Sequence, residues 1–185
     1  MIKYFETIRC ENKKALHLKY HQQRVFNTIG KWLEFHLEPP TNDLYRCKII
    51  YTKNHICAIQ YYTYTPKKIH KFKLIYDNNL QYNYKYLDRS LIDQYQDKSY
   101  DEIIIVQNNY ITDTSIANIA IFLDNIWLTP KTPLLYGTTR ERYLDDNKIY
   151  QRDITVEMLR KATKIMTLNA MVKIVFQKNE YIIIE

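Results

Sequence analysis

Glycine is scarce in this chain of 185 residues, which contains only two glycines. The sequence has no Walker motif, no Gly-x-Gly-x-x-Gly dinucleotide fingerprint and no zinc-ligand pattern. No nucleophile, histidine and carboxylate form a recognisable triad signature. The classes of protein that carry these local signatures are therefore not indicated.

Long hydrophobic runs are also missing. The most apolar stretches, such as IIIV (103–106) and YIIIE (181–185), are too short to cross a bilayer, and the first ten residues lack the apolar core of a signal peptide. Cys10, Cys47 and Cys57 form no Cys-x-x-Cys pair, so we expect reduced thiols and no metal site. We therefore expect a cytoplasmic protein with no membrane partner.

The net charge of +7 and the 18 tyrosines are compatible with a groove for single-stranded nucleic acid. The lysines, however, are spread along the chain without a block of five or six, and Lys, Asn, Ile and Tyr are abundant throughout. The composition therefore predicts no nucleic-acid partner, with a basic nucleic-acid module kept as an alternative.

The first half of the chain predicts a hairpin, a helix and three strands. Apolar residues recur at helical spacing from about Lys19 to Leu37, and EPPTND ends that run. Three β-rich runs follow, at 44–52, 56–65 and 69–76. We expect these runs to form an antiparallel meander that packs on the helix.

The second half predicts short helices among strands. A helix from Asp88 to about Gln96, one starting at GTTRERYL and one at Thr155 alternate with apolar strands, among them DEIIIV and KIMTLNAMVKIVF. The fold class is α+β: two small lobes of mostly antiparallel sheet with packed helices. We place the N-terminal lobe at 1–87 and the C-terminal lobe at 88–185.

The segment GTTRE, Gly137 to Glu141, carries the most mechanistic local signal. Thr138 followed three residues later by Glu141 is a capping-box pattern, which predicts a helix start. The free N–H groups there, beside the hydroxyls of Thr138 and Thr139, suit an anion the size of phosphate. Most such patterns only begin a helix, so both interpretations stay open.

Three isolated charged residues remain ambiguous on the residues alone. Asp113 lies between apolar strands, where burial would require a cationic partner, unless it is a turn residue that accepts nearby N–H groups. Arg24 is one helical turn from His21 and suits a phosphate dianion, although a solvated arginine is the ordinary alternative. By composition, Lys85 in YKYLDR is one more surface cation.

Taken in order, six segments resemble the class IV aminotransferase family, the fold-type-IV pyridoxal-phosphate enzymes. They are FETIR (5–9), YHQQRV (20–25), KYLDR (85–89), DEIIIVQNNYITDTSIANIAIF (101–122), WLTPKTPLLYGTTR (127–140) and TLNAM (167–171). The resemblance covers most of the chain from residue 5 to 171. It implies a D-amino-acid aminotransferase-like fold with pyridoxal 5'-phosphate between the lobes, and a homodimer.

The resemblance also implies residue roles. Lys85 stands where the family's catalytic Schiff-base lysine stands. Asp113 occupies the place of the acid that pairs with the pyridine nitrogen, where the family usually has Glu. The other positions implied for the cofactor, mainly for its phosphate, are Arg24, Ser115, Ala117, Asn118, Gly137, Thr138 and Thr139. Those implied for the substrate are Arg9, Asn169 and Ala170.

Within the family, KYLDR resembles the Lys-x-Leu-Asn-Arg string of aminodeoxychorismate lyases, with Asp88 in place of Asn. This implies a lyase of folate biosynthesis that converts 4-amino-4-deoxychorismate to 4-aminobenzoate and pyruvate. The alternatives are a branched-chain or D-amino-acid aminotransferase, and a cofactor-binding protein without turnover. The chain is short for the family and lacks the usual strand before FET, which affects substrate identity and turnover more than cofactor binding.

Overall fold

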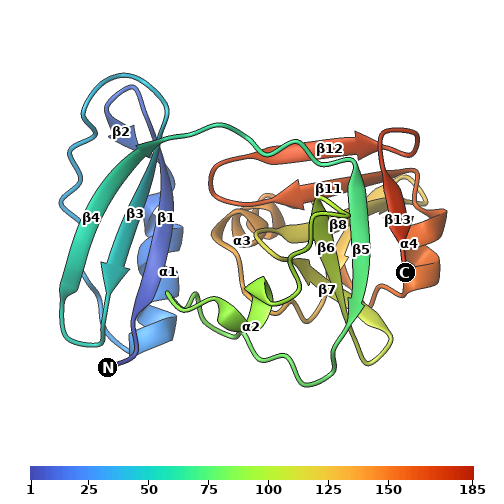
Figure 1. Ribbon diagram of the computed structural model, residues 1–185. Coiled ribbons are helices and arrows are strands. Elements are labelled where there is room, and N and C mark those ends of the chain that lie inside the picture. Colours follow the sequence, from blue (N-terminus) through green and yellow to red (C-terminus); the bar gives the residue numbers. More distant parts are fainter. The chain divides into compact units, whose positions relative to one another are not determined.

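The computed structural model describes residues 1–185 and divides the chain into two compact units (Figure 1). Unit 1 comprises Met1–Pro66 and Tyr84–Arg89, and unit 2 comprises Lys67–Asn83 and Ser90–Glu185. The chain thus leaves unit 1 after Pro66 and returns to it for the short segment that contains Lys85. The sequence interpretation had a single boundary, at residue 87.

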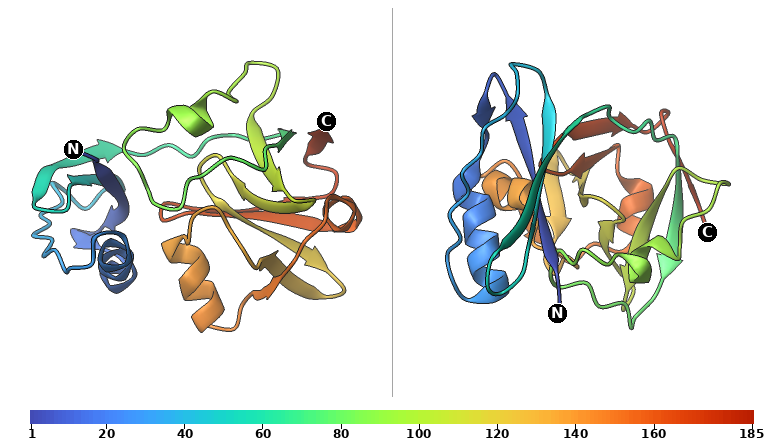
Figure 2. Two further views of the ribbon diagram at one scale, coloured as in Figure 1. Left: turned by 90° about the horizontal axis from the view of Figure 1, so that it is seen from below. Right: turned by 60° about the vertical axis from the view of Figure 1, so that its left-hand side comes forward.

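Unit 1 is an antiparallel sheet with one helix on it. Its elements are β1 (Tyr4–Glu11), β2 (Lys14–Ala15), α1 (Leu18–Ile29), β3 (Tyr45–Tyr51) and β4 (Ile56–Thr63), and the strand order is β2-β1-β3-β4. Helix α1 lies against one face of the sheet (Figure 2), where Val25 packs with Ile8 of β1 and Ile49 of β3. Alternate residues of β1 and β3 are buried, as expected for strands with one covered face.

Helix α1 is shorter than the sequence predicts. The apolar spacing continues to Leu37, but the helix ends at Ile29. Gly30 has a φ of 75° and donates its N–H to the carbonyl of Phe26 at 2.7 Å. A glycine in the left-handed region closes a helix without strain, so the glycine overrides the apolar pattern.

Unit 2 contains a larger mixed sheet. Its elements are β5 (Lys71–Tyr76), α2 (Ser90–Asp93), β6 (Glu102–Gln107), β7 (Tyr110–Thr114), β8 (Asn118–Leu123), β9 (Ile126–Pro130), α3 (Thr138–Asp145), β10 (Tyr150–Arg152), α4 (Val156–Lys161), β11 (Lys164–Leu168), β12 (Lys173–Gln177) and β13 (Ile182–Ile184). The strand order is β10-β9-β8-β7-β6-β5-β13, and β11 pairs with both β8 and β12. Strand β8 therefore lies at a junction of three neighbours, β7, β9 and β11.

The predicted three-strand meander is wrong in its third strand. Strand β5 belongs to unit 2, where it pairs in parallel with β6 and with β13. Phe72 and Leu74 of β5 are buried in a core that also contains Ile104 and Phe176. Strand β5 thus buries its apolar face against strands that follow it by more than 25 residues, a pairing that the local pattern does not reveal.

Two other elements differ from the prediction. The helix expected from Asp88 to Gln96 is reduced to α2, and the long strand expected at 164–176 is the β11–β12 hairpin. The α+β class is confirmed, with antiparallel pairing in most of both sheets. Cys10 and Cys47 are buried and Cys57 is exposed, all as free thiols. None of the helices is long and apolar enough to span a membrane.

Candidate active site

Lys85 is held against the first strand of unit 1. The N–H of Phe5 in β1 donates to the carbonyl of Lys85 at 2.9 Å, and Tyr86 forms an antiparallel bridge with Tyr4. The amine of Lys85 lies 4.4 Å from the centroid of the Phe5 ring. Because backbone bonds fix its position, Lys85 is not a freely moving surface cation.

A buried ionic cluster lies in the same unit. Glu6 of β1 is fully buried, and its carboxylate accepts two bonds from Arg24, from Nε at 2.9 Å and from Nη2 at 2.5 Å. His21 Nδ1 donates to the same carboxylate at 2.6 Å. Since His21 and Arg24 are separated by one turn of α1, both reach Glu6 from the same face of the helix.

Electrostatics in this cluster separate the two charge types. Burial opposes ionisation of Glu6, but the charge of Arg24 and the bond from His21 prevail and lower its pKa to about 2. Burial and, secondarily, the charge of Arg24 lower the pKa of Lys85 to about 7, although Glu6 acts in the opposite sense. The amine of Lys85 can therefore be neutral near neutral pH, as a nucleophile or base must be.

In unit 2, Asp113 and Asn118 flank the turn between β7 and β8. Asp113 Oδ1 accepts from Asn118 Nδ2 at 2.6 Å, and Oδ2 accepts from the N–H of Leu135 at 2.9 Å. Asn118 Nδ2 also donates to the carbonyl of Leu135 at 2.8 Å. A Cβ on Gly137 would lie 1.8 Å from Asn118 Oδ1, so only glycine lets the start of α3 approach this closely.

The expected direct cationic partner of Asp113 is not what the structure shows. Both carboxylate oxygens accept from neutral donors, and Arg140 acts on Asp113 only as a nearby charge. Burial is the largest effect and raises the pKa of Asp113 to about 7, against the smaller lowering by its hydrogen bonds. Near neutral pH, the charge of Asp113 therefore depends on the group it faces.

Helix α3 begins at the predicted place but with a different cap. Gly137, and not Thr138, is the N-cap, and the first helical hydrogen bond runs from the N–H of Glu141 to the carbonyl of Gly137. The capping-box prediction is thus wrong in its details. The Thr139 hydroxyl instead donates to the carbonyl of Asn169 at 2.9 Å, which joins the start of α3 to the β11–β12 turn.

The turn Thr114–Ala117 uses its polar groups internally. The N–H and the hydroxyl of Ser115 both donate to Glu102, and the N–H of Ala117 donates to the Thr114 hydroxyl at 3.0 Å. These contacts do not favour the predicted contribution of Ser115 and Ala117 to a phosphate site. Their donors stabilise the turn itself.

The predicted site residues are thus divided between the two units. Unit 1 contains Lys85, Arg24 and Arg9, and the Arg9 guanidinium pairs with Glu11 at 2.8 Å. In unit 2, hydrogen bonds and close packing connect the following residues: Asp113, Asn118, Gly137, Thr139 and Asn169. Thr138 is the first residue of α3 and Ala170 lies in the β11–β12 turn, in the same unit.

Four charged residues of the site region had no role in the sequence interpretation: Glu6, His21, Glu102 and Arg140. Arg140 is fully buried, and its Nη2 donates to the carbonyl of Pro130 at 2.7 Å. Glu6, Glu102 and Arg140 lie within the segments that carry the family resemblance, which was the available signal. The i, i+3 spacing of His21 and Arg24 was the signal for a shared partner.

Comparisons with known proteins agree with this geometry. Residues 83–178 match the family described as amino-transferase class IV. An uncharacterized protein of Haemophilus influenzae is 35% identical over 92% of this chain and 98% of its own length. A crystal structure from Haemophilus somnus 129PT, provisionally named a 4-amino-4-deoxychorismate lyase, is 32% identical with a TM-score of 0.81, covering 92% of this chain and 97% of that one.

More distant structures share the fold. A provisionally named amino-acid aminotransferase from Mesorhizobium loti is 19% identical with a TM-score of 0.79, and both chains are covered completely. The fold and the site define a fold-type-IV enzyme. The chain belongs to the class IV aminotransferase family, a family of pyridoxal-phosphate-dependent enzymes.

Proposed function

We propose that this protein binds pyridoxal 5'-phosphate and uses Lys85 as its catalytic residue. The observation that carries the proposal is the chain of contacts from Asp113 through Asn118 to Gly137. It ties a buried carboxylate to the start of a helix, and the cofactor has two charged ends that need such groups: a ring nitrogen and a phosphate. The residues present therefore fit the cofactor.

Each residue has a separate task in this proposal. Bound pyridoxal phosphate supplies an electron sink for a bond-breaking step at carbon. Asp113 keeps the ring nitrogen protonated, because a carboxylate beside it favours the charged form. Arg24 and the N–H groups at the start of α3 hold the phosphate, which orients the ring.

Lys85 bonds to the cofactor and, when released as a free amine, accepts the proton from the amine-bearing carbon of the substrate. Its lowered pKa, about 7, supports this role, because a base works best when its pKa lies near the operating pH. Glu6 contributes indirectly, since its two bonds to Arg24 orient the guanidinium.

The reaction we favour is conversion of 4-amino-4-deoxychorismate to 4-aminobenzoate and pyruvate, a step towards folate. The segment KYLDR and the provisional name of the Haemophilus somnus relative support it. The family match itself supports an amino-acid aminotransferase as the second candidate. The reactions differ in one requirement: only the aminotransferase needs a keto-acid acceptor.

Absorption spectroscopy tests cofactor binding. We expect protein mixed with pyridoxal phosphate to gain a visible band that borohydride removes, leaving the cofactor attached to Lys85. Lys85→Ala should lose the band, whereas Lys161→Ala should keep it because Lys161 is exposed on α4. A wild-type protein that takes up no cofactor would overturn the proposal.

Supplying amino-deoxychorismate without any acceptor separates the two reactions. Release of 4-aminobenzoate and pyruvate supports the lyase, and dependence on a keto acid supports the aminotransferase. Cofactor uptake without turnover in either assay would indicate a binding protein. We further propose a cytoplasmic homodimer, which light scattering should detect as twice the monomer mass.

A further inference from the structure

Glu102 is a buried acid that the proposed function does not use. It is the first residue of β6 and is completely buried. Oε1 accepts from the N–H of Ile103 at 3.0 Å, and from the N–H of Ser115 at 3.1 Å and its hydroxyl. A buried carboxylate is costly compared with an apolar residue of similar size, so its presence at the start of an otherwise apolar strand requires a reason.

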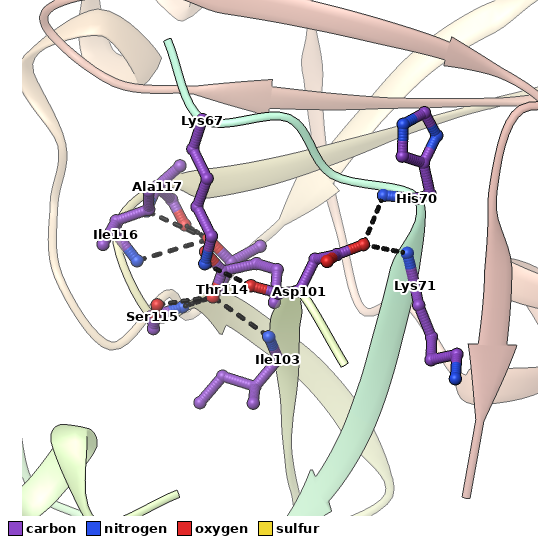
Figure 3. A network of polar contacts seen from close by, with 10 residues as sticks. Lys67, His70, Lys71, Asp101, Ile103, Thr114, Ser115, Ile116 and Ala117 are labelled. Atoms are coloured by element: carbon purple, nitrogen blue, oxygen red, sulfur yellow. Dashed lines mark hydrogen bonds and ion pairs between the residues drawn. The ribbon is translucent and has the colours of Figure 1, made fainter. Parts of the chain in front are cut away.

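The second carboxylate oxygen has a single charged neighbour. Glu102 Oε2 makes no hydrogen bond, and the amine of Lys67 lies 3.7 Å from it. Lys67 also donates to the carbonyl of Asp101 (Figure 3). Lys67 thus offsets the charge of Glu102, while the directional bonds of Glu102 are spent on Ser115 and Ile103.

Those bonds replace a missing part of the sheet. The β6–β7 register shifts between Ile104 and Val106, and the last pair of the ladder is Ile104 with Thr114. Beyond Thr114, the backbone of β7 has no further partner in β6. The Glu102 side chain binds the next N–H, that of Ser115, where a ladder carbonyl would otherwise be needed.

The turn held in this way carries the polar groups of the site. Within it, the N–H of Thr114 donates to the carbonyl of Ala117 at 2.9 Å. Asp113 and Asn118 pair at the two ends of the turn, 2.6 Å apart between Oδ1 and Nδ2. Any displacement of Ser115 therefore moves Asp113 relative to Asn118 and to the start of α3.

We propose that Glu102 is a positioning residue that, through Ser115, sets the placement of the Asp113 carboxylate against the ring nitrogen of the cofactor. The inference rests on the proposed function, in which Asp113 faces that nitrogen. Glu102 itself contacts neither cofactor nor substrate in this role.

The test compares two probes, pyridoxal phosphate and its carbocyclic analogue with a ring C–H in place of the nitrogen. Wild-type protein should prefer pyridoxal phosphate, and Asp113→Asn should abolish the preference. Glu102→Gln should reduce the preference about tenfold, since a charge-assisted bond to Ser115 is lost. Glu157→Gln, an exposed acid of α4, is the matched control and should change nothing.

A merely structural loss would weaken both probes equally and leave their ratio unchanged, which would overturn the inference. If Glu102→Gln does not fold, Ser115→Ala decides, because it removes the hydroxyl bond without changing the charge. A smaller fall in the ratio supports the inference, and an unchanged ratio overturns it.

Failure of the proposed function has a different signature. If wild-type protein binds neither probe, the proposed function fails, and the link from Glu102 to Asp113 is tested without cofactor by carboxyl ¹³C NMR. Titration of Asp113 should shift to lower pH in Glu102→Gln and Ser115→Ala as water enters the loosened turn. An unchanged titration would overturn the link.

Discussion

Glu6 in unit 1 and Asp113 in unit 2 are both buried carboxylates, with 0% and 4% of their surfaces exposed. Glu6 binds a guanidinium and a histidine, whereas Asp113 binds a carboxamide and a backbone N–H. Their pKa values move in opposite directions, to about 2 for Glu6 and about 7 for Asp113. Burial alone therefore does not determine the charge of an acid here; its partners do.

The difference matches two kinds of work. Glu6 stays ionised over the physiological range, so its hold on Arg24 is permanent. Asp113 has no cation bonded to it and is close to its midpoint at neutral pH, so an incoming cationic group can determine its charge. A structural anchor and a ligand-responsive acid thus differ mainly in the donors that surround them.

Removing Glu6 should break the ionic side of this comparison with the largest effect. Glu6→Ala leaves Arg24 and His21 without their shared buried acceptor, and breaking such a cluster costs about 3 to 5 kcal/mol. Urea unfolding should show this loss. The exposed Glu157→Gln should change the free energy of unfolding by less than about 0.5 kcal/mol, and an equal loss in both variants would contradict the prediction.

Titrating the cofactor-free protein sharpens the other side. The folded-state pKa of Asp113 lies above its ordinary value of 3.8, so the folded state binds more protons and this contribution to stability is present at low pH. It should be lost as the pH rises from about 4 to about 7, by up to about 4 kcal/mol. Urea unfolding at pH 5 and pH 8 should show the loss in wild type and not in Asp113→Asn.

Gly137→Ala should disturb the neutral network from outside. The new Cβ would collide with Asn118 Oδ1, so Asn118 must move away from Asp113, at a cost of about 1 to 3 kcal/mol. Thermal unfolding measures it. The double variant Gly137→Ala/Asn118→Ala should cost no more than Asn118→Ala alone, since the clash is then absent; additive losses would argue against this coupling.

Thr139→Val should have the smallest effect. It removes only the hydroxyl bond to the Asn169 carbonyl, worth about 1 kcal/mol. We expect a modest fall in unfolding free energy and weaker retention of inorganic phosphate, measured by calorimetry. Thr163→Val, at an exposed threonine with a longer bond of 3.4 Å to Phe122, is the control and should change neither quantity appreciably.

Much of the secondary structure of unit 2 was predictable, because its signals are local. The start of α3 in GTTRE, the apolar strand after Glu102 and the β7–β8 turn each depend on residues within a few positions. The partner of β5 was not predictable, since its pattern suits any sheet, and only the fit of Phe72 and Leu74 against distant residues decides between sheets.

The candidate site divides in the same way. Lys85, Arg24 and Asp113 were identified from the order of short segments, and their roles remain predictions to be tested by the spectra described above. Glu6, His21 and Glu102 were missed as a group because an acid in a strand looks the same whether it faces water or the core. Their identity as anchors depends on contacts with residues far along the chain.

The amino-acid sequence by itself determined the family, the α+β class and the helix start at Gly137, because these depend on local spacing and on the order of segments. Only the tertiary structure decided that Glu6 is a charged anchor and that Asp113 titrates near neutrality. The partners concerned lie 15 and 18 residues from Glu6 and 22 residues from Asp113. A carboxylate's pKa is set by the groups within a few ångströms of it, and folding alone brings those groups there.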